Sequence, residues 1–213
     1  MYAILALLLL PFGAYCQDVK DTLVEKCGID PCEGVPSTGS TDSLCNNKFL
    51  GPSVLTAAND DEWSSLFEGY SPLGTYCPKA FLDKFAPSGN KYIYPEMDGA
   101  LLDTEGKPVT TTYTLPEGME LDRFGSKYGG YLAPRDTPFS WRSIPPSNLN
   151  KYPDSPQYNY WVWVVKESFN ITGGPIAPWF GQNGYGLQFH QESGLKQLEG
   201  RYLELVAKKK CVV

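Results

Sequence analysis

The stretch Tyr160-Trp-Val-Trp-Val-Val165 is aromatic or β-branched at every position. Such residues favour extended backbone, and an uninterrupted apolar run of this length is typical of a strand buried on both faces. We therefore expect it to be a central strand of a sheet. Further strand candidates lie on both sides of it, separated by turn clusters such as Pro116-Glu-Gly118. They cover residues 91–94, 100–103, 109–113, 131–133, 187–190 and 202–207.

The composition favours many short elements joined by turns. The 213 residues include 21 glycines and 18 prolines, and 14% of the chain is aromatic. Glycine and proline interrupt helices, and an aromatic content this high is untypical of a disordered chain. Two short helices are expected, one after Asn59 with acidic residues in its first turn and one over Pro78–Phe85 with proline at its first position. The predicted fold class is therefore α+β and β-rich.

Charge and hydropathy argue against two classes of function. The formal net charge is −6 and charged residues make up 20% of the chain, whereas a nucleic-acid-binding protein normally has a basic face. No internal apolar run approaches the ~20 residues of a transmembrane helix. We therefore expect no nucleic-acid partner and no transmembrane segment, and we interpret Lys208-Lys-Lys210 as a solvated tail.

The start of the chain predicts export. An apolar run is followed by the small residues Ala14 and Cys16, which suit the −3 and −1 positions of a signal peptide over residues 1–16, cleaved before Gln17. The alternative is a buried N-terminal helix. Asn170-Ile-Thr172 is an N-glycosylation sequon, which agrees with export. We expect a protein that is secreted, extracellular or at the cell surface, with a glycan on Asn170.

Four cysteines gather in the N-terminal part of the exported chain: Cys27, Cys32, Cys45 and Cys77. In an oxidising compartment they suit two disulfides, and the sequence leaves all three pairings open. Cys211 is left over, to be free, intermolecular, or paired with Cys16 if cleavage falls earlier. We expect no metal site, because there is no Cys-x-x-Cys and His190 is the only histidine.

The segment Leu121–Pro134 is rich in groups that bind anions. It combines the fixed cation of Arg123 with glycines that can expose backbone N–H groups. An arginine fork and backbone donors together can hold a phosphate. The alternative is a structural pair between Asp122 and Arg123 beside a tight turn.

A second segment, Gly173–Phe189, feeds a glycine-rich loop into a strand. Trp179 and Phe180 are expected to be half-exposed rings among its turn residues. Gln188 places a polar amide between two apolar neighbours, which indicates a side chain facing a cleft. The alternative is ordinary strand alternation with Gln188 on the solvent face. The chain has no Gly-x-Ser-x-Gly elbow, Walker A sequence or Gly-x-Gly-x-x-Gly.

Five motifs follow one another in a fixed order. They are Asp122-Arg-Phe-Gly125, Gly129-Gly-Tyr-Leu-Ala-Pro134, Arg142-Ser-Ile-Pro-Pro146, Ala177-Pro-Trp-Phe-Gly-Gln182 and Gly186-Leu-Gln-Phe189. Together they resemble the tuberculosis necrotizing toxin (TNT) domain, and more closely the secreted fungal NADases that carry it. The Phe81-Leu-Asp-Lys84 and Tyr92-Ile-Tyr-Pro95 segments are also similar, so the resemblance covers nearly all of the chain after the signal peptide.

The resemblance implies an NAD⁺ glycohydrolase that releases nicotinamide and ADP-ribose and also hydrolyses NADP⁺. The family's essential arginine and glutamine correspond to Arg123 and Gln188, which we expect to be catalytic. The expected substrate-binding residues are Phe124, Gly125, Tyr131, Arg142, Trp179 and Phe180. The toxin's additional histidine falls near Tyr158–Trp161, where this chain has none.

The fungal fold implies a disulfide-linked thumb with short helices over residues 17–90 and a twisted antiparallel β palm, the catalytic domain, over residues 91–213. Some members are dimers, which leaves a homodimer open. Some bind calcium near an acidic C-terminal extension, but this chain ends in Lys208-Lys-Lys210-Cys-Val-Val213, so we expect no calcium site and no cofactor. Two rival functions are a non-catalytic secreted protein that binds cell wall or carbohydrate, and an ADP-ribosyltransferase.

Overall fold

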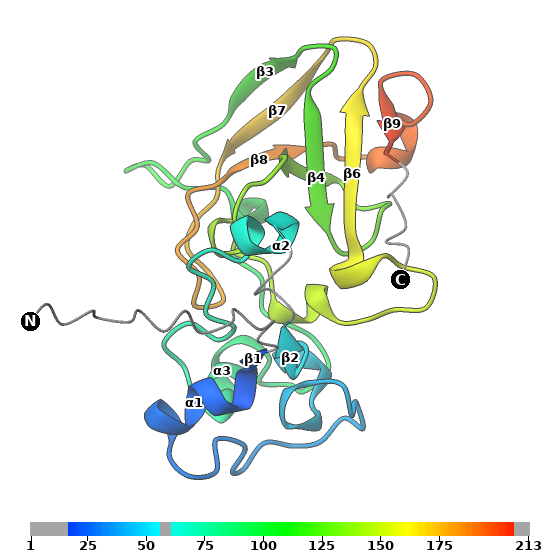
Figure 1. The fold of residues 1–213 in the computed structure, drawn as a ribbon. Helices are drawn as coiled ribbons and strands as arrows, with labels where there is room; N and C mark the ends of the chain where they lie inside the picture. The colour runs from blue at the N-terminus through cyan, green and yellow to red at the C-terminus, as the bar shows by residue number, and fades with distance from the viewer. Residues whose placement is uncertain (1–16, 56–60, 207–213) are drawn as a thin grey trace, which may run out of the picture.

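The computed structural model describes residues 17–55 and 61–206 (Figure 1). The predicted signal peptide over residues 1–16, the helix cap Asn59, the Lys208–Lys210 tail and Cys211 lie outside these residues. Within them, no helix has the length and apolar character needed to cross a membrane.

Seven antiparallel strands form the main sheet, in the order β3-β7-β8-β5-β4-β6-β9. The strands are β3 (Thr111–Leu115), β4 (Glu120–Phe124), β5 (Tyr131–Pro134), β6 (Tyr160–Val165), β7 (Phe169–Pro175), β8 (Leu187–His190) and β9 (Leu203–Leu205). The short elements of the N-terminal part are β1 (Gln17–Asp18), α1 (Val19–Cys27), β2 (Val54–Leu55), α2 (Asp61–Leu66) and α3 (Pro78–Phe85). Short 3₁₀ turns cover Leu44–Asn46, Lys48–Leu50, Met97–Gly99, Phe139–Trp141, Pro146–Leu149, Gln157–Asn159 and Leu195–Gln197. The α+β, β-rich prediction is confirmed.

Strand β6 explains why its sequence is apolar throughout. It pairs with β4 on one side and β9 on the other, and its two faces enter two different hydrophobic clusters. Tyr160 and Val162 belong to the first cluster, whereas Trp163 and Val165 belong to the second. A strand buried on both faces needs no polar alternation, as predicted.

Other strand predictions fare unevenly. The strands over 131–133 and 187–190 are confirmed as parts of β5 and β8, and those at 109–113 and 202–207 correspond to β3 and β9 with shifted ends. The predictions for 91–94 and 100–103 are wrong. These residues are loop, and within 100–103 only Ala100 and Leu102 form isolated bridges.

Two strands escaped prediction, β4 and β7. Strand β4 carries Asp122 and Arg123, and β7 carries Asn170 and two glycines. Aspartate, asparagine and glycine are all depleted in strands, so the local sequence preference argues against both β4 and β7. Pairing on both sides, with β5 and β6 for β4 and with β3 and β8 for β7, overrides that preference.

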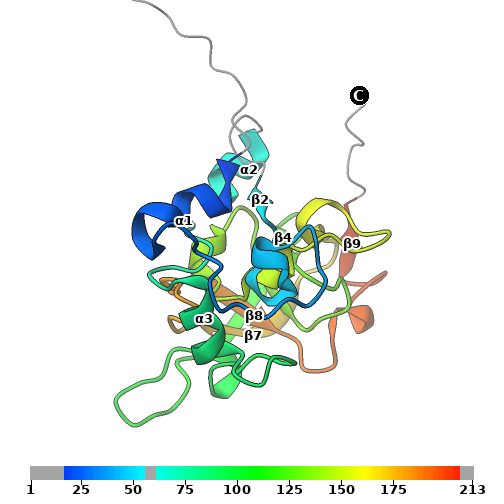
Figure 2. The same ribbon diagram turned by 90° about the horizontal axis from the view of Figure 1, so that it is seen from below.

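Helix α2 and the residue that follows it pack on the sheet through aromatic side chains, whereas α1 and α3 lie beyond the strand ends (Figure 1). Figure 1 places α1 and α3 below the sheet, and in the view from below (Figure 2) they come to the front. Trp63 of α2 meets Tyr160 of β6 edge to face, and Phe67 packs beside Phe124 of β4. The first hydrophobic cluster thus contains residues from both sides of the expected thumb–palm boundary at residue 90; that division itself stays a prediction.

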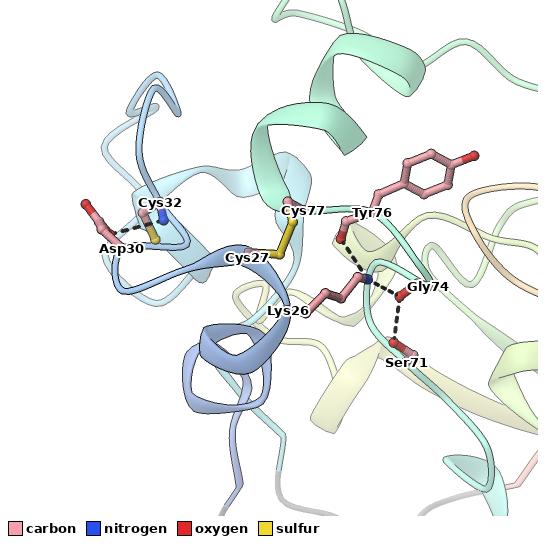
Figure 3. Close-up of a disulfide and its surroundings, with 8 residues drawn as sticks. All are labelled: Lys26, Cys27, Asp30, Cys32, Ser71, Gly74, Tyr76 and Cys77. Carbon is pink, nitrogen blue, oxygen red and sulfur yellow. Dashed lines mark hydrogen bonds between the residues drawn. A yellow bond between two sulfur atoms is a disulfide. The ribbon is translucent and has the colours of Figure 1, made fainter.

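Two disulfides, as expected, brace this N-terminal part. Of the three pairings that the sequence permits, the structure has Cys27–Cys77 and Cys32–Cys45. The first joins the last residue of α1 to the residue before α3 (Figure 3). Beside it, Lys26 Nζ donates a hydrogen bond of 2.9 Å to the carbonyl of Gly74. The Cys27–Cys77 bridge therefore holds the end of α1 beside the start of α3.

Candidate active site

A cavity of about 480 Å³ opens along β4, β5 and β8, within the size range of ligand pockets. Loop residues 94–99 and 142–148 supply much of its opposite wall. Arg123 and Gln188, far apart in the chain, both line it. The antiparallel order β8-β5-β4 brings them to the same hollow, because only β5 separates their strands.

Arg123 presents a cation to the cavity. Its Nη1 donates a hydrogen bond of 2.6 Å to the carbonyl of Tyr131, and its buried Nε has no partner. Among the residues that the structure describes, no carboxylate lies within ion-pair distance of it. Burial, and secondly the charge of Arg142, lowers the pKa of Arg123 to about 10. The group is therefore still charged at neutral pH and suited to an anion.

Gly125 and Gly129, next to this guanidinium, do not offer the free N–H groups that were predicted. The N–H of Gly125 donates to Asn159 and that of Gly129 donates to Ser126, so neither amide is free for a phosphate. A Cβ on Gly129 would instead lie 2.3 Å from Nη2 of Arg123. Gly129 makes room for the guanidinium.

We predict that Gly129→Ala lowers kcat/KM for the substrate by about 100-fold while the protein stays folded. The φ of Gly129 is compatible with alanine, so the added methyl acts by displacing the guanidinium, and a shift of ~1 Å in a positioning group can cost that factor. Steady-state kinetics with a melting curve measure both effects. Tyr128→Ala, an exposed change in the same turn, is the control. Wild-type activity in the Gly129 variant would contradict the role of the guanidinium.

Gln188 lines the same cavity from β8, as the cleft-facing interpretation requires. Its Nε2 donates a hydrogen bond of 3.2 Å to the carbonyl of Asp98. Opposite it in the neighbouring strand stands Gly174, which has no side chain to cover the amide. Its place in the cavity wall therefore favours the cleft-facing interpretation over the solvent-face alternative.

Tyr131 completes the wall between these two residues. Its ring stacks on that of His190, with centroids 4.4 Å apart and planes at 9°. Burial, and secondly the nearby carboxylate of Asp98, raises the pKa of Tyr131 to about 12, so its hydroxyl is neutral at physiological pH. His190 therefore packs against Tyr131 and supports its ring in the cavity wall.

Arg142 lines the cavity, but its donors are already engaged. Its Nη1 lies 2.6 Å from the carboxylate of Asp122, with side-chain exposures of 5% and 0%, and its Nε and Nη2 donate to the carbonyl of Thr137. Asp122 also accepts from the Tyr160 hydroxyl at 2.8 Å and the Asp136 N–H at 3.0 Å. The alternative of an Asp122–Arg123 pair is therefore wrong, because the carboxylate pairs with Arg142. Arg142 holds the wall together.

The aromatic residues expected at the substrate differ in their positions. Phe180 is fully buried against Phe85 and Tyr92, so the half-exposed ring and the substrate contact predicted for it are wrong. Trp179 is half-buried and donates from Nε1 to the carbonyl of Ile93, but it does not line the cavity. Both rings pack on Phe85 of α3 and so anchor the loop that precedes β8.

Phe124 and Gly125 do lie in the cavity wall. The ring of Phe124 is only 3% exposed, however, and packs on Phe139 beneath the guanidinium of Arg142. Where the toxin's histidine was expected, Trp161 donates from Nε1 to the carbonyl of Gly125 at 2.8 Å. That contact fixes the turn after β4.

Sequence reasoning missed Asp98. It lies in the turn Met97–Gly99 and lines the cavity beside Gln188. The Asp-Gly pair indicates a turn with left-handed backbone, but no local pattern connects that turn with the strands of the site. Asn170 is exposed on β7 and accepts a hydrogen bond from Thr114; its glycosylation stays a prediction.

This chain is similar to known proteins in its family, its sequence and its structure. The family model described as "Tuberculosis necrotizing toxin" matches residues 114–206. The conidial surface nicotinamide adenine dinucleotide glycohydrolase nadA of Aspergillus fumigatus is 44% identical over 178 residues, covering 81% of this chain and 74% of the relative. Among solved structures, tuberculosis necrotizing toxin in complex with its immunity factor IFT aligns with a TM-score of 0.47 at 20% identity, over 82% of this chain and 86% of the toxin. Rhs1-CT in complex with its cognate immunity protein RhsI1 aligns with a TM-score of 0.35 at 17% identity, over 54% and 85%.

Proposed function

Since the chain belongs to the tuberculosis necrotizing toxin domain family, together with a fungal surface NAD glycohydrolase, we propose that the cavity along β4, β5 and β8 binds NAD⁺ and cleaves its nicotinamide–ribose bond. The chain is an NAD⁺ glycohydrolase by this kinship. Nicotinamide and ADP-ribose are the products, and NADP⁺, which has the same bond, is a second substrate. The observation that carries the mechanism is the guanidinium of Arg123, which has no ion-pair partner among the described residues, in the same cavity as the amide of Gln188.

Cleavage of the nicotinamide–ribose bond does not require a general acid. The nicotinamide of NAD⁺ is already cationic and leaves as a neutral molecule, so no group has to protonate it, unlike the leaving group in ordinary glycoside cleavage. The remaining ribose carbon resembles an oxocarbenium ion. Holding the dinucleotide and one water in the reactive arrangement can supply roughly 7–11 kcal/mol of the barrier. A site built from positioning groups is therefore sufficient.

In the proposed complex Arg123 binds the pyrophosphate. Its guanidinium lines the cavity, and Nη1 is the donor that a protein acceptor occupies in the described part of the chain; the planar arginine group suits phosphate oxygens. The bound anion also compensates the buried charge, because Asp122 already neutralises Arg142 next to it. A net-acidic protein can bind this anion, since the field near the site depends on the local cation.

Gln188 is proposed to hold a ribose hydroxyl or the attacking water. The amide is anchored at Nε2 by the carbonyl of Asp98 and keeps its oxygen for the substrate side. Tyr131 and Phe124 shield the cleft from bulk water, while Gly125 shapes its floor. Arg142 contributes by keeping this wall in place.

Location and assembly are inferred from the same kinship. The relative's name places that protein on the conidial surface. We infer that this chain, too, is exported and acts outside the cell, in keeping with its two disulfides. A homodimer and the absence of a calcium site are further proposals.

Product analysis tests the function. Purified protein incubated with NAD⁺ should release free nicotinamide and ADP-ribose in equal amounts, separated by chromatography. An ADP-ribosyltransferase would release nicotinamide while ADP-ribose appears on an acceptor. A wall- or carbohydrate-binding protein would leave NAD⁺ intact, and that result would end the proposal.

The Gln188→Ala variant tests the second side chain. We expect kcat to fall by about 100-fold with a smaller change in KM, because the amide's hydrogen bond strengthens as the transition state forms. Gln191→Ala is the matched control, since that amide bonds Ser193 and does not line the cavity. Steady-state kinetics that show a raised KM at unchanged kcat would assign Gln188 to ground-state binding instead.

A further inference from the structure

We propose that Asp98 is a further catalytic residue, whose carboxylate accepts the proton of the water that attacks the ribose. This inference rests on the proposed function of the cavity. Two carboxylates line the cavity, Asp98 and Asp122. Asp122 is buried in an ion pair with Arg142, whereas Asp98 is exposed and forms no ion pair within the described part of the chain. Asp98 is thus the carboxylate available to a substrate.

The backbone aims Asp98 at the cavity by an uncommon turn. Met97, Asp98 and Gly99 follow one another at φ of 49°, 56° and 77°. Left-handed backbone costs free energy at residues other than glycine, and it persists where the surroundings fix it, often at functional sites. Here the N–H of Ala177 donates to Gly99 at 2.8 Å and the N–H of Ala100 donates to Met97 at 3.0 Å. These hydrogen bonds therefore hold the turn, and with it the carboxylate of Asp98, in one position.

Contacts connect Asp98 to both residues of the proposed mechanism. Its carbonyl accepts the hydrogen bond from Gln188, and its carboxylate interacts with the hydroxyl of Tyr131. The carbonyl of Tyr131 in turn accepts the bond from Arg123. Asp98 and Gln188 also line a second, adjoining cavity of about 210 Å³, so they stand at the border of two hollows. A water between the amide oxygen of Gln188 and the carboxylate would meet two acceptors.

Charge distribution in the cavity matches the substrate. NAD⁺ has a negative pyrophosphate and a positive pyridinium ribose. The cavity has a cation, Arg123, and a carboxylate, Asp98, neither of which forms an ion pair with any residue that the structure describes. With the pyrophosphate on Arg123, the cationic end of the dinucleotide finds its counter-charge at Asp98. A negative charge there also stabilises the oxocarbenium-like transition state.

The proposed step balances in charge and atoms. The bond between the ribose carbon and the nicotinamide nitrogen breaks, and its electron pair stays on the ring, which becomes neutral. The oxygen of water forms the new bond to that carbon. One proton of the water passes to the carboxylate of Asp98, and solvent later removes it. No oxidant, metal or further reactant is needed.

Asp98→Asn is the main test. Asparagine tolerates left-handed backbone and keeps a hydrogen-bonding group beside Tyr131, but it accepts no proton. We expect kcat for NAD⁺ hydrolysis to fall by about 100-fold or more, the usual contribution of general base catalysis, with an unchanged melting temperature. Glu96→Gln, a nearby exposed carboxylate that lines neither cavity, should keep wild-type activity.

A second variant separates catalysis from structure. Asp98→Gly fits the same backbone and leaves space for sodium azide, an anionic nucleophile that has no proton to lose. We expect azide to restore turnover and to give ADP-ribosyl azide. An Asp98→Asn enzyme within a few-fold of wild type, or an inactive Asp98→Gly enzyme that azide does not rescue, would overturn the proposal. Failure of the wild-type protein to cleave NAD⁺ in the same assay would instead refute the function itself.

Discussion

Arg123→Ala lowers kcat/KM for NAD⁺ by at least about 100-fold in our account, and it leaves the fold intact. The loss follows because Arg123 is the cation of the cavity that is free to bind a pyrophosphate, and removing one donor of this kind typically costs 10²–10³ in rate. Stability should not fall. Since the pKa of Arg123 is lowered, its charge costs folding free energy at neutral pH, and alanine removes that cost.

Two variants frame this experiment. Arg201→Ala removes an exposed arginine that pairs with Glu167 outside the cavity, and it should keep both activity and melting temperature. Arg123→Lys retains the charge without the planar fork and should recover only part of the rate. Steady-state kinetics and a melting curve on each protein suffice. Near-normal hydrolysis by the alanine variant would refute the pyrophosphate clamp.

Arg142→Ala is expected to lower the stability of the protein most strongly, whereas Arg123→Ala lowers its activity. Removing one partner of a buried ion pair leaves the carboxylate of Asp122 uncompensated and typically costs about 3–5 kcal/mol. Burial already raises the pKa of Asp122 against the opposing charge of Arg142. For a chain of this size each kcal/mol lowers the melting temperature by about 2–4 °C, which calorimetry resolves easily.

A double substitution identifies the cause. Arg142→Ala combined with Asp122→Asn removes the stranded charge and should recover part of the lost stability, because the neutral amide is cheaper to bury than an unpaired carboxylate. A single Arg142→Ala variant that melts like the wild type would contradict the structural role, and Arg142 would then be free to bind substrate.

The pair Arg123 and Arg142 shows how far sequence reasoning reaches. Motif resemblance identified both as site residues, and the strand over Tyr160–Val165 follows from composition alone. The arginine that forms an ion pair with Asp122 is no longer available to a substrate. Side chains alternate between the two faces of β4, and this alternation determines which arginine lies next to Asp122. Asp122 and Phe124 point to one face of the strand, toward Tyr160 and Arg142, and Arg123 points to the other.

The residues that escaped prediction share a cause. Phe180 is fully buried because α3 covers its loop, and a glycine-rich sequence gives no sign of such tertiary cover. Asp98 enters the site through a turn whose partners, Ala177 and Gln188, lie far along the chain. The pairing of Cys27 with Cys77, which the sequence left open, likewise joins residues that lie 50 positions apart. Long-range contacts of this type arise only when distant parts of the chain assemble, so no local sequence pattern reports them.

A crystal structure with an NAD⁺ analogue whose nicotinamide–ribose bond cannot be cleaved would show where the pyrophosphate and the ribose bind. We predict pyrophosphate oxygens about 3 Å from the Arg123 guanidinium, with the nicotinamide ribose between Gln188 and Asp98. An analogue bound elsewhere, or one whose pyrophosphate lies away from an unoccupied Arg123, would contradict the account.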